Sequence, residues 1–287
     1  MMSVAWAEAS ILAVLGALVG SFLNVVIHRL PRMLERRWSE ECAVLHADLA
    51  PDATSPPAEG VTYNLMVPGS ACPHCGHQIR WYENIPLLSY AFLRGKCSSC
   101  ATSISLRYPM VELCTALLFA WCGWRWGLSW EALAWAGFSA ALVALTGIDW
   151  DTTLLPDDIT LPLLWAGLVL SAMGILAVPL KDSLWGAVGG YLSLWLVYWA
   201  FKLATGKEGM GYGDFKLFAA LGAWFGWSAL IPLILMASVI GAITGIGIKL
   251  FSQLREGGYV PFGPFLALAG LTAMISGADS ILAAIGL

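Results

Sequence analysis

The chain has 287 residues, of which 59% are hydrophobic and only 12% are charged. Its mean hydropathy is +0.73, and a single soluble core of this size could not hide so much apolar surface from water. The net charge of -4 argues against a nucleic acid as the main partner. The composition therefore predicts a protein whose main surroundings are a lipid bilayer.

The apolar segments predict an all-α polytopic protein with about eight transmembrane helices, because about 20 apolar residues cross a bilayer as a helix. The run Phe215–Lys249 is too long for one crossing, and Gly226 with Pro232 in its middle predicts a hairpin of two helices. The other predicted spans are Val4–Ile27, Val111–Leu128, Trp130–Ile148, Ile159–Val178, Ser183–Ala204 and Gly263–Leu287.

One hydrophilic segment, residues 29–109, separates a first transmembrane helix in residues 1–28 from a membrane core in residues 110–287. No basic residue precedes the first span, so we expect it to be a retained helix and not a signal peptide. If the N-terminus lies outside, all of the 15 lysines and arginines except Arg125 and Lys181 lie on the inner side. This positive-inside bias predicts that residues 29–109 form a cytoplasmic loop domain.

Two Cys-x-x-Cys pairs, Cys72 with Cys75 and Cys97 with Cys100, lie within this loop. Their spacing is typical of two turns that share one tetrahedral zinc ion, whereas unrelated thiols or redox pairs are the alternative. Four thiolates fill the coordination sphere and leave no position for a catalytic water, so we expect a structural zinc. We expect the nearby His74 and His77 to face solvent, although either could replace a cysteine as a ligand.

Acidic residues are rare in the predicted spans, and two of them fall at the same membrane face. Asp149 ends the third span, and Asp214 begins the sixth. Charged groups at membrane depth are costly, so such acids are candidates for function. Asp214 could equally be the N-cap of its helix, and Asp157 and Asp158 could be a solvated turn and cap.

Two neighbouring carboxyl groups at low dielectric cannot easily both ionise, so one is expected to keep its proton while the other activates water. This is the arrangement of an aspartic protease, and it needs no metal. The glycines at Gly211 and Gly213 would let an extended peptide approach Asp214 closely, because glycine has no side chain.

Several motifs together resemble those of the type IV prepilin peptidases, which are bifunctional leader peptidase and N-methyltransferase enzymes. The resemblance covers essentially the whole chain and includes both cysteine pairs. The other motifs are Gly20–Pro31, Glu83–Pro86, Leu93–Cys97, Ile148–Asp157 and Gly209–Asp214.

The resemblance implies that Asp149 and Asp214 are the catalytic pair and that Asp151 is secondary. It implies an enzyme of the bacterial inner membrane that cleaves basic leaders of type IV prepilins and type II secretion pseudopilins after a glycine, at the cytoplasmic face. The new N-terminal residue, usually phenylalanine, is then methylated with S-adenosylmethionine. The segment around Gly95 and Lys96 matches the part of the loop tied to methyl transfer, although no dinucleotide-type glycine motif follows a predicted strand.

Two rival functions remain open from the residues alone. A transporter or channel could use Asp149 and Asp214 for proton or cation coupling, but transport sites usually lie near the membrane midplane, and transport gives no reason for a zinc loop. A membrane scaffold could use the zinc loop to dock a partner, with the acids as helix caps; replacement of either acid by asparagine would then leave function intact.

Overall fold

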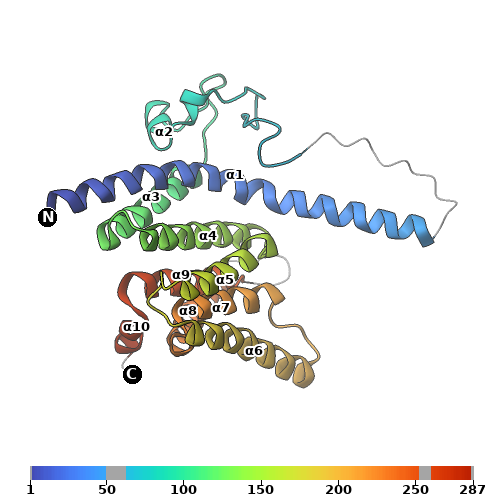
Figure 1. Cartoon of the computed structure of the whole chain (residues 1–287). Coiled ribbons are helices and arrows are strands. Elements are labelled where there is room, and N and C mark those ends of the chain that lie inside the picture. The colour runs from blue at the N-terminus through green and yellow to red at the C-terminus, as the bar shows by residue number, and fades with distance from the viewer. Residues whose placement is uncertain (1, 50–62, 252–259, 286–287) are drawn as a thin grey trace.

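The computed structural model describes residues 2–49, 63–251 and 260–285 (Figure 1). Within these ranges the regular secondary structure is helical, apart from two isolated bridges in the cysteine segment. The predicted all-α architecture is therefore confirmed. Residues 50–62 of the predicted loop and residues 286–287 of the last predicted span lie outside the described residues.

Every predicted apolar segment contains a helix, and the predicted hairpin occurs at Gly226, which has φ 82° and separates α7 from α8. Two short 3-10 helices, Trp81–Asn84 and Trp227–Ala229, complete the elements. The α-helices are α1 (Met2–Leu49), α2 (Leu88–Phe92), α3 (Arg107–Trp126), α4 (Trp130–Thr152), α5 (Asp157–Ala172), α6 (Leu180–Thr205), α7 (Tyr212–Phe225), α8 (Leu230–Phe251), α9 (Gly263–Ser276) and α10 (Ala278–Ile285).

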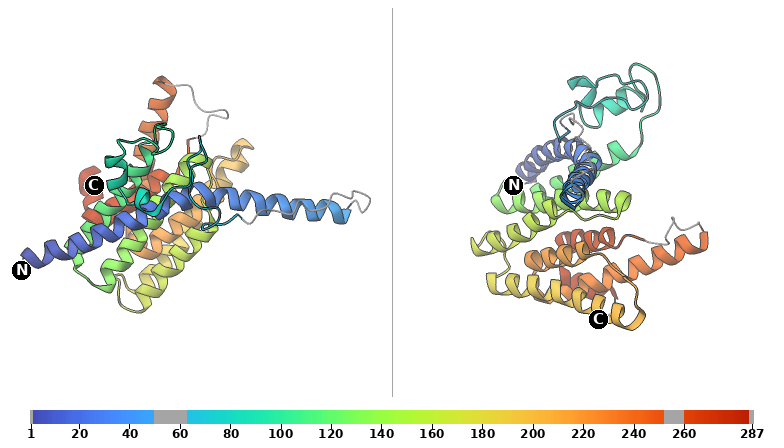
Figure 2. Two further views of the ribbon diagram at one scale, coloured as in Figure 1. Left: turned by 90° about the horizontal axis from the view of Figure 1, so that it is seen from above. Right: turned by 90° about the vertical axis from the view of Figure 1, so that its right-hand side faces the viewer.

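Helix α1 is much longer than the expected span, because it continues from Ile27 through Pro31 to Leu49. The continuation is rich in Leu, Glu and Arg, which propagate helices well even where the surrounding side chains are polar. In Figures 1 and 2 this half of α1 extends past the end of the other helices. Part of the segment expected to be loop is thus helix.

Two other predicted helix ends differ from those observed. Helix α5 stops at Ala172 and does not reach Val178, because Gly174 has φ 69° and turns the chain. The last apolar segment is divided into α9 and α10 at Gly277, which has φ 85°. Glycine favours this left-handed region because it has no Cβ.

Four helical segments are long and apolar enough to cross a membrane: Val4–Leu45, Trp130–Thr152, Leu180–Thr205 and Trp227–Leu250. Helices α5, α7 and α9 have 16, 14 and 14 residues and are shorter than a full crossing. The four long segments and these shorter helices together make the chain a multi-pass membrane protein.

Helix α7 forms the centre of the core and is in contact with α5, α6, α8 and α9. Its side chains Phe215, Leu217, Phe218, Leu221 and Trp224 are at most 1% exposed. Helix α1 packs mainly against α3 and also against α4, on the other side of the molecule (Figure 1).

Three ion pairs join helix ends and connections at one end of the bundle. They are Arg107 with Asp151, Lys216 with Asp157, and Lys202 with Glu208. The first links the start of α3 to the end of α4, and the second links the starts of α5 and α7. The end of α4 and the start of α7 therefore lie at the same end of the bundle, as the sequence predicted.

Candidate active site and metal centre

Asp149 and Asp214 line one cavity of about 750 Å³. Asp149 lies in the last turn of α4 and is 4% exposed, while Asp214 lies in the first turn of α7 and is 7% exposed. Two carboxyl groups from separate helices are thus buried at the wall of the same open space.

The N-cap interpretation of Asp214 is wrong. The N-cap of α7 is Gly211, whose backbone is extended, and no side-chain capping hydrogen bond is present there. Asp214 is the third residue of the helix, and its backbone N–H donates to the carbonyl of Gly211 at 3.3 Å. Asp214 is therefore not the N-cap, although its carboxyl group lies beside the backbone of Gly211.

Gly263, the first residue of α9, lies directly against Asp149. A Cβ at this position would be 2.5 Å from Oδ2 of Asp149, so any larger residue would displace the carboxyl group. Oδ2 of Asp149 is buried and makes no hydrogen bond of normal geometry with the described residues, although the backbone of Gly263 lies close enough to interact with the carboxyl group. A buried carboxylate oxygen without a partner is costly, and it indicates a place where a ligand atom or water completes the site.

The two glycines before Asp214 have different roles. A Cβ on Gly213 would be 2.6 Å from Cβ of Leu155, so this glycine allows α7 to pack against the connection between α4 and α5. A Cβ on Gly211 would meet only Oδ2 of Asp214, at 3.7 Å. Both glycines line the cavity. The space beside Gly213, where a substrate peptide was expected to approach, is filled by Leu155.

The remaining acids at this end differ in position. Asp151 is exposed and ion-paired with Arg107, and it does not line the cavity. Asp157 and Asp158 lie in the first turn of α5 and line the cavity, as does Glu208. A hydrogen bond from Lys202, at 2.8 Å, lowers the pKa of Glu208, which keeps its charge at neutral pH.

The lining of the cavity holds five carboxyl groups and one lysine, and two of the carboxyl groups are ion-paired with lysines. Lys216 donates to both carboxylate oxygens of Asp157 at 2.7 Å. The rest of the lining is largely apolar and includes Leu34 and Trp38 of α1.

Leu34 and Trp38 are functional candidates that the sequence analysis missed. They come from the helical continuation that was expected to be loop. The sequence feature that could have identified them is their spacing of four residues within a charged stretch, which places both side chains on one face of a helix.

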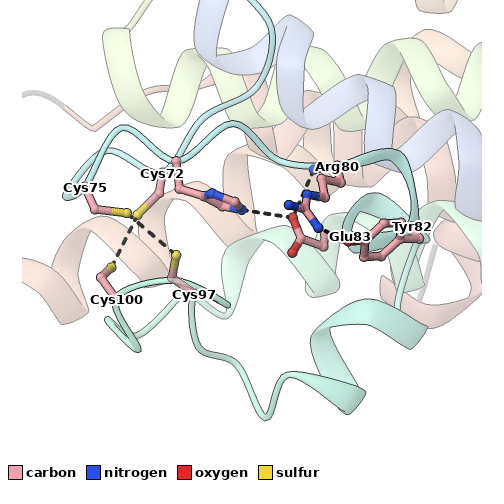
Figure 3. A network of polar contacts seen from close by, with 8 residues as sticks. Cys72, Cys75, Arg80, Tyr82, Glu83, Cys97 and Cys100 are labelled. Carbon is pink, nitrogen blue, oxygen red and sulfur yellow. Dashed lines mark hydrogen bonds and ion pairs between the residues drawn. The ribbon is translucent and has the colours of Figure 1, made fainter.

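The four cysteines of the loop form a metal-binding group. Their sulfur atoms all lie within 4.8 Å of one another, with 3.8 Å between Cys72 and Cys100 and 4.0 Å between Cys75 and Cys97 (Figure 3). Zinc–sulfur bonds of about 2.3 Å in a tetrahedron require sulfur–sulfur separations of about 3.8 Å. The geometry therefore fits a zinc ion held by four thiolates.

Both cysteine pairs lie in turns of the same construction. The N–H of Cys72 donates to His77, and the N–H of Cys97 donates to Thr102. The residues that follow the second cysteine of each pair, Gly76 and Ala101, have φ of 70° and 58°. Gly76 was expected to turn sharply, whereas Ala101 adopts this conformation despite its Cβ.

His77 does not simply face solvent, because its Nε2 lies 3.2 Å from the carboxylate of Glu83. The N–H of Arg80 also donates to Glu83, at 2.9 Å (Figure 3). These contacts, led by the one to Arg80, lower the pKa of Glu83. His74 is exposed, as predicted, and neither histidine belongs to the metal-binding group.

Gly95 and Lys96 lie in this cysteine module and do not line the carboxylate cavity. Gly95 is buried and has φ 67°, and a Cβ there would be 2.7 Å from the hydroxyl of Tyr90. It therefore has a clear packing role. Lys96 is exposed, and its backbone pairs with Ser103.

Glu112 of α3 joins the module to the membrane helices. It is 9% exposed, and its carboxylate accepts a hydrogen bond from the backbone N–H of Leu87 at 2.8 Å. Leu87 has φ 61°, an unfavourable conformation for leucine. The sequence analysis did not single out Glu112, because its partner is a backbone group 25 residues away.

The fold and site define a class: a multi-pass helical membrane protein with two buried carboxyl groups in one acidic cavity and a separate four-cysteine centre. The chain belongs to the type IV leader peptidase family. Residues 136–246 match the profile described by that name, and residues 14–126 match the bacterial peptidase A24 N-terminal domain. The resemblance stated from the motifs is therefore confirmed.

Relatives cover nearly the whole chain. A prepilin leader peptidase/N-methyltransferase of Stutzerimonas stutzeri is 53% identical over 266 residues, which are 92% of this chain and 89% of the relative. Proteins of the same name from Pseudomonas aeruginosa and Aeromonas hydrophila are 53% and 52% identical; they cover 92% and 96% of this chain and 88% and 93% of their own lengths. No solved structure matches the chain.

Proposed function

We propose that this chain cleaves the leader peptides of type IV prepilins and type II secretion pseudopilins and then methylates the new N-terminus. The main support for the peptidase activity is the pair of buried carboxyl groups, Asp149 and Asp214, in one cavity. The names of the relatives support both activities.

In the proposed mechanism the two aspartates share one proton. The ionised carboxylate takes a proton from a water molecule as its oxygen attacks the scissile carbonyl carbon. The protonated carboxyl group polarises the carbonyl oxygen and then protonates the leaving amine. The unpartnered Oδ2 of Asp149 is an acceptor that such a water could use.

The charge of the cavity supports a basic substrate. Lys216 neutralises Asp157 and Lys202 neutralises Glu208, so the net negative charge of the lining comes from Asp158 and the proton-sharing pair. This charge favours a positively charged leader. The same end of the bundle carries Arg107, Lys202 and Lys216, which favours its placement at the cytoplasmic face of the bacterial inner membrane.

The cysteine module, Cys72, Cys75, Cys97 and Cys100, holds a structural zinc in this proposal. The four thiolates would hold the ion, and its bonds would crosslink a segment too small to build its own core. S-adenosylmethionine supplies the methyl group. A side chain at Gly95 would meet Tyr90, so this glycine shapes the backbone of the proposed methyl-transfer segment, while the exposed Lys96 contacts the donor.

The deciding experiment measures cleavage of a prepilin by the purified full-length protein in detergent, followed by mass. Wild type is compared with Asp149→Asn and Asp214→Asn. Asp151→Asn is the matched control, because this neighbouring aspartate is exposed and lies outside the cavity. Each protein is assayed with and without a metal chelator.

We expect both cavity variants to lose cleavage by at least about 10³-fold, since removal of a catalytic group usually has an effect of this size, while Asp151→Asn keeps activity. Wild-type cleavage should resist the chelator. If cleavage survives in both cavity variants, the two-aspartate mechanism is wrong, and a transport or scaffold role for the two acids becomes the better explanation.

A further inference from the structure

Helix α2 of the cysteine module has two opposite faces of different character. Tyr90 turns toward the module, because its hydroxyl donates to the carbonyl of Ile104 at 3.3 Å and would meet any side chain at Gly95. Leu88 and Phe92 are four residues apart and lie on the opposite side of the helix from Tyr90. These two apolar side chains are 57% and 84% exposed. The described part of the chain therefore leaves the outward face of α2 uncovered.

The start of α2 is held beside the apolar part of α1. The N–H of Leu87, the residue before α2, donates to the carboxylate of Glu112 in α3 at 2.8 Å. Glu112 packs directly on α1, because a Cβ at Gly20 would be 2.7 Å from its Cα. Gly20 lies about 13 Å along the helix axis before Arg29, the first lysine or arginine of the chain. The start of α2 therefore lies at the depth of the apolar span and not beyond its end.

A second contact agrees with this depth. The side-chain amide of Asn24, which also precedes Arg29, donates to the carbonyl of Tyr108 at 3.1 Å, in the first turn of α3. Helices α1 and α3 therefore run side by side in opposite directions, and α3 reaches the apolar region within its first turns. Figures 1 and 2 show α2 beside the N-terminal half of α1, on the side away from the rest of the bundle.

The surroundings of the helices at this depth are lipid. Leu113 and Leu117 of α3 are exposed, and large apolar side chains that point away from a membrane bundle contact acyl chains. The module also carries residues typical of the boundary between membrane and water. Trp81 is exposed, and so are the basic residues Arg80 and Arg94.

We propose that the outward face of α2 is a lipid-binding surface, in which Leu88 and Phe92 insert among phospholipid acyl chains and hold the cysteine module on the membrane. In water these two neighbouring side chains would be costly, whereas at this depth the acyl chains cover them. Residues 63–106 are then attached to the bilayer and are not a domain free in the cytoplasm. This contact goes beyond the proposed peptidase and methyltransferase activities and depends on neither.

The first test places the photoreactive residue p-benzoylphenylalanine at single positions of the full-length protein in nanodiscs of phosphatidylethanolamine and phosphatidylglycerol. It replaces Phe92 in one protein and Leu88 in another, so that failure of one to fold leaves the other. Leu117, on the exposed face of α3, is the positive control. Leu45 is the negative control, because it is exposed in the part of α1 that extends past the other helices (Figure 1).

After illumination, lipid adducts at Phe92 and Leu88 should exceed those at Leu45 about tenfold and approach those at Leu117, as expected of side chains within the acyl region. Adducts no more abundant than at Leu45 would overturn the lipid-binding surface. Crosslinks to a second copy of the chain, or to a prepilin added to the nanodiscs, in place of lipid would also overturn it, because the face would then contact protein.

A second test weakens the contact. Leu88→Asp combined with Phe92→Asp should let an added protease cut residues 63–106 about tenfold faster than in wild type, because charged side chains leave the acyl region and the module opens. Leu45→Asp is the matched control and should be cut in this segment at the wild-type rate. Neither changed residue lines the carboxylate cavity, so retained leader cleavage shows that the membrane helices are folded. Cutting of the double variant at the wild-type rate would show that lipid does not hold the module.

Discussion

The ammonium group of Lys216 lies 2.7 Å from both carboxylate oxygens of Asp157, and this ion pair joins the first turn of α7 to the first turn of α5. Asp214 lies in the same turn of α7, two residues before Lys216. The pair therefore fixes the relative position of the two helix starts that border the cavity.

We predict that Lys216→Ala lowers the free energy of unfolding by less than about 1 kcal/mol, because partly exposed ion pairs contribute little. Cleavage should fall less than about tenfold, since Lys216 orders the rim and does not act on the bond. A double-mutant cycle with Asp157→Ala, scored by thermal unfolding and cleavage rate, measures the coupling. A loss as complete as that of Asp214→Asn would make Lys216 part of the chemistry.

Gly263→Ala should impair cleavage while the protein still inserts and folds. The new Cβ would lie 2.5 Å from Oδ2 of Asp149, so the carboxyl group or the start of α9 must shift. A displacement of about 1 Å at a reacting group can cost about 10²-fold in rate. Gly137→Ala is the control, because a Cβ at Gly137 in the same helix as Asp149 would meet no atom within 4 Å. Equal activity of the two variants would contradict the close contact.

Cys72→Ser should release zinc and lower methylation more than cleavage. Wild-type protein should contain one zinc per chain, and loss of one thiolate should loosen the module that holds Lys96. Metal content, methyl incorporation and leader release are measured together. Cys114→Ser is the control, since Cys114 lies outside the metal-binding group. If both activities disappear equally without loss of protein, the separate roles of module and cavity are wrong.

Glu112→Ala should free the cysteine module from α3. The variant leaves the N–H of Leu87 without its acceptor, at a cost of about 1 to 3 kcal/mol where the group is buried. Protease cleavage within residues 63–106 should become faster, as seen by mass. Glu112→Gln retains an oxygen acceptor and should behave nearly as wild type. If Glu112→Ala is as resistant as wild type, the hydrogen bond does not hold the module.

Local patterns were sufficient for much of the fold and for the grouping of the four cysteines. Hydropathy predicted the apolar helices, because a bilayer requires long apolar segments with internal hydrogen bonds. The spacing of Cys72, Cys75, Cys97 and Cys100 predicted their grouping, because a tetrahedral ion needs ligands from two tight turns.

The sequence alone determined that this is a membrane protein with a cysteine centre and two acids at one face. Only the tertiary structure decided that Asp149 and Asp214 share a cavity, that Gly263 presses on Asp149, and that α1 brings Trp38 to the same space. These relationships depend on how helices far apart in the chain pack together. Packing is set by the shapes of many side chains at once, and no local pattern of residues records it.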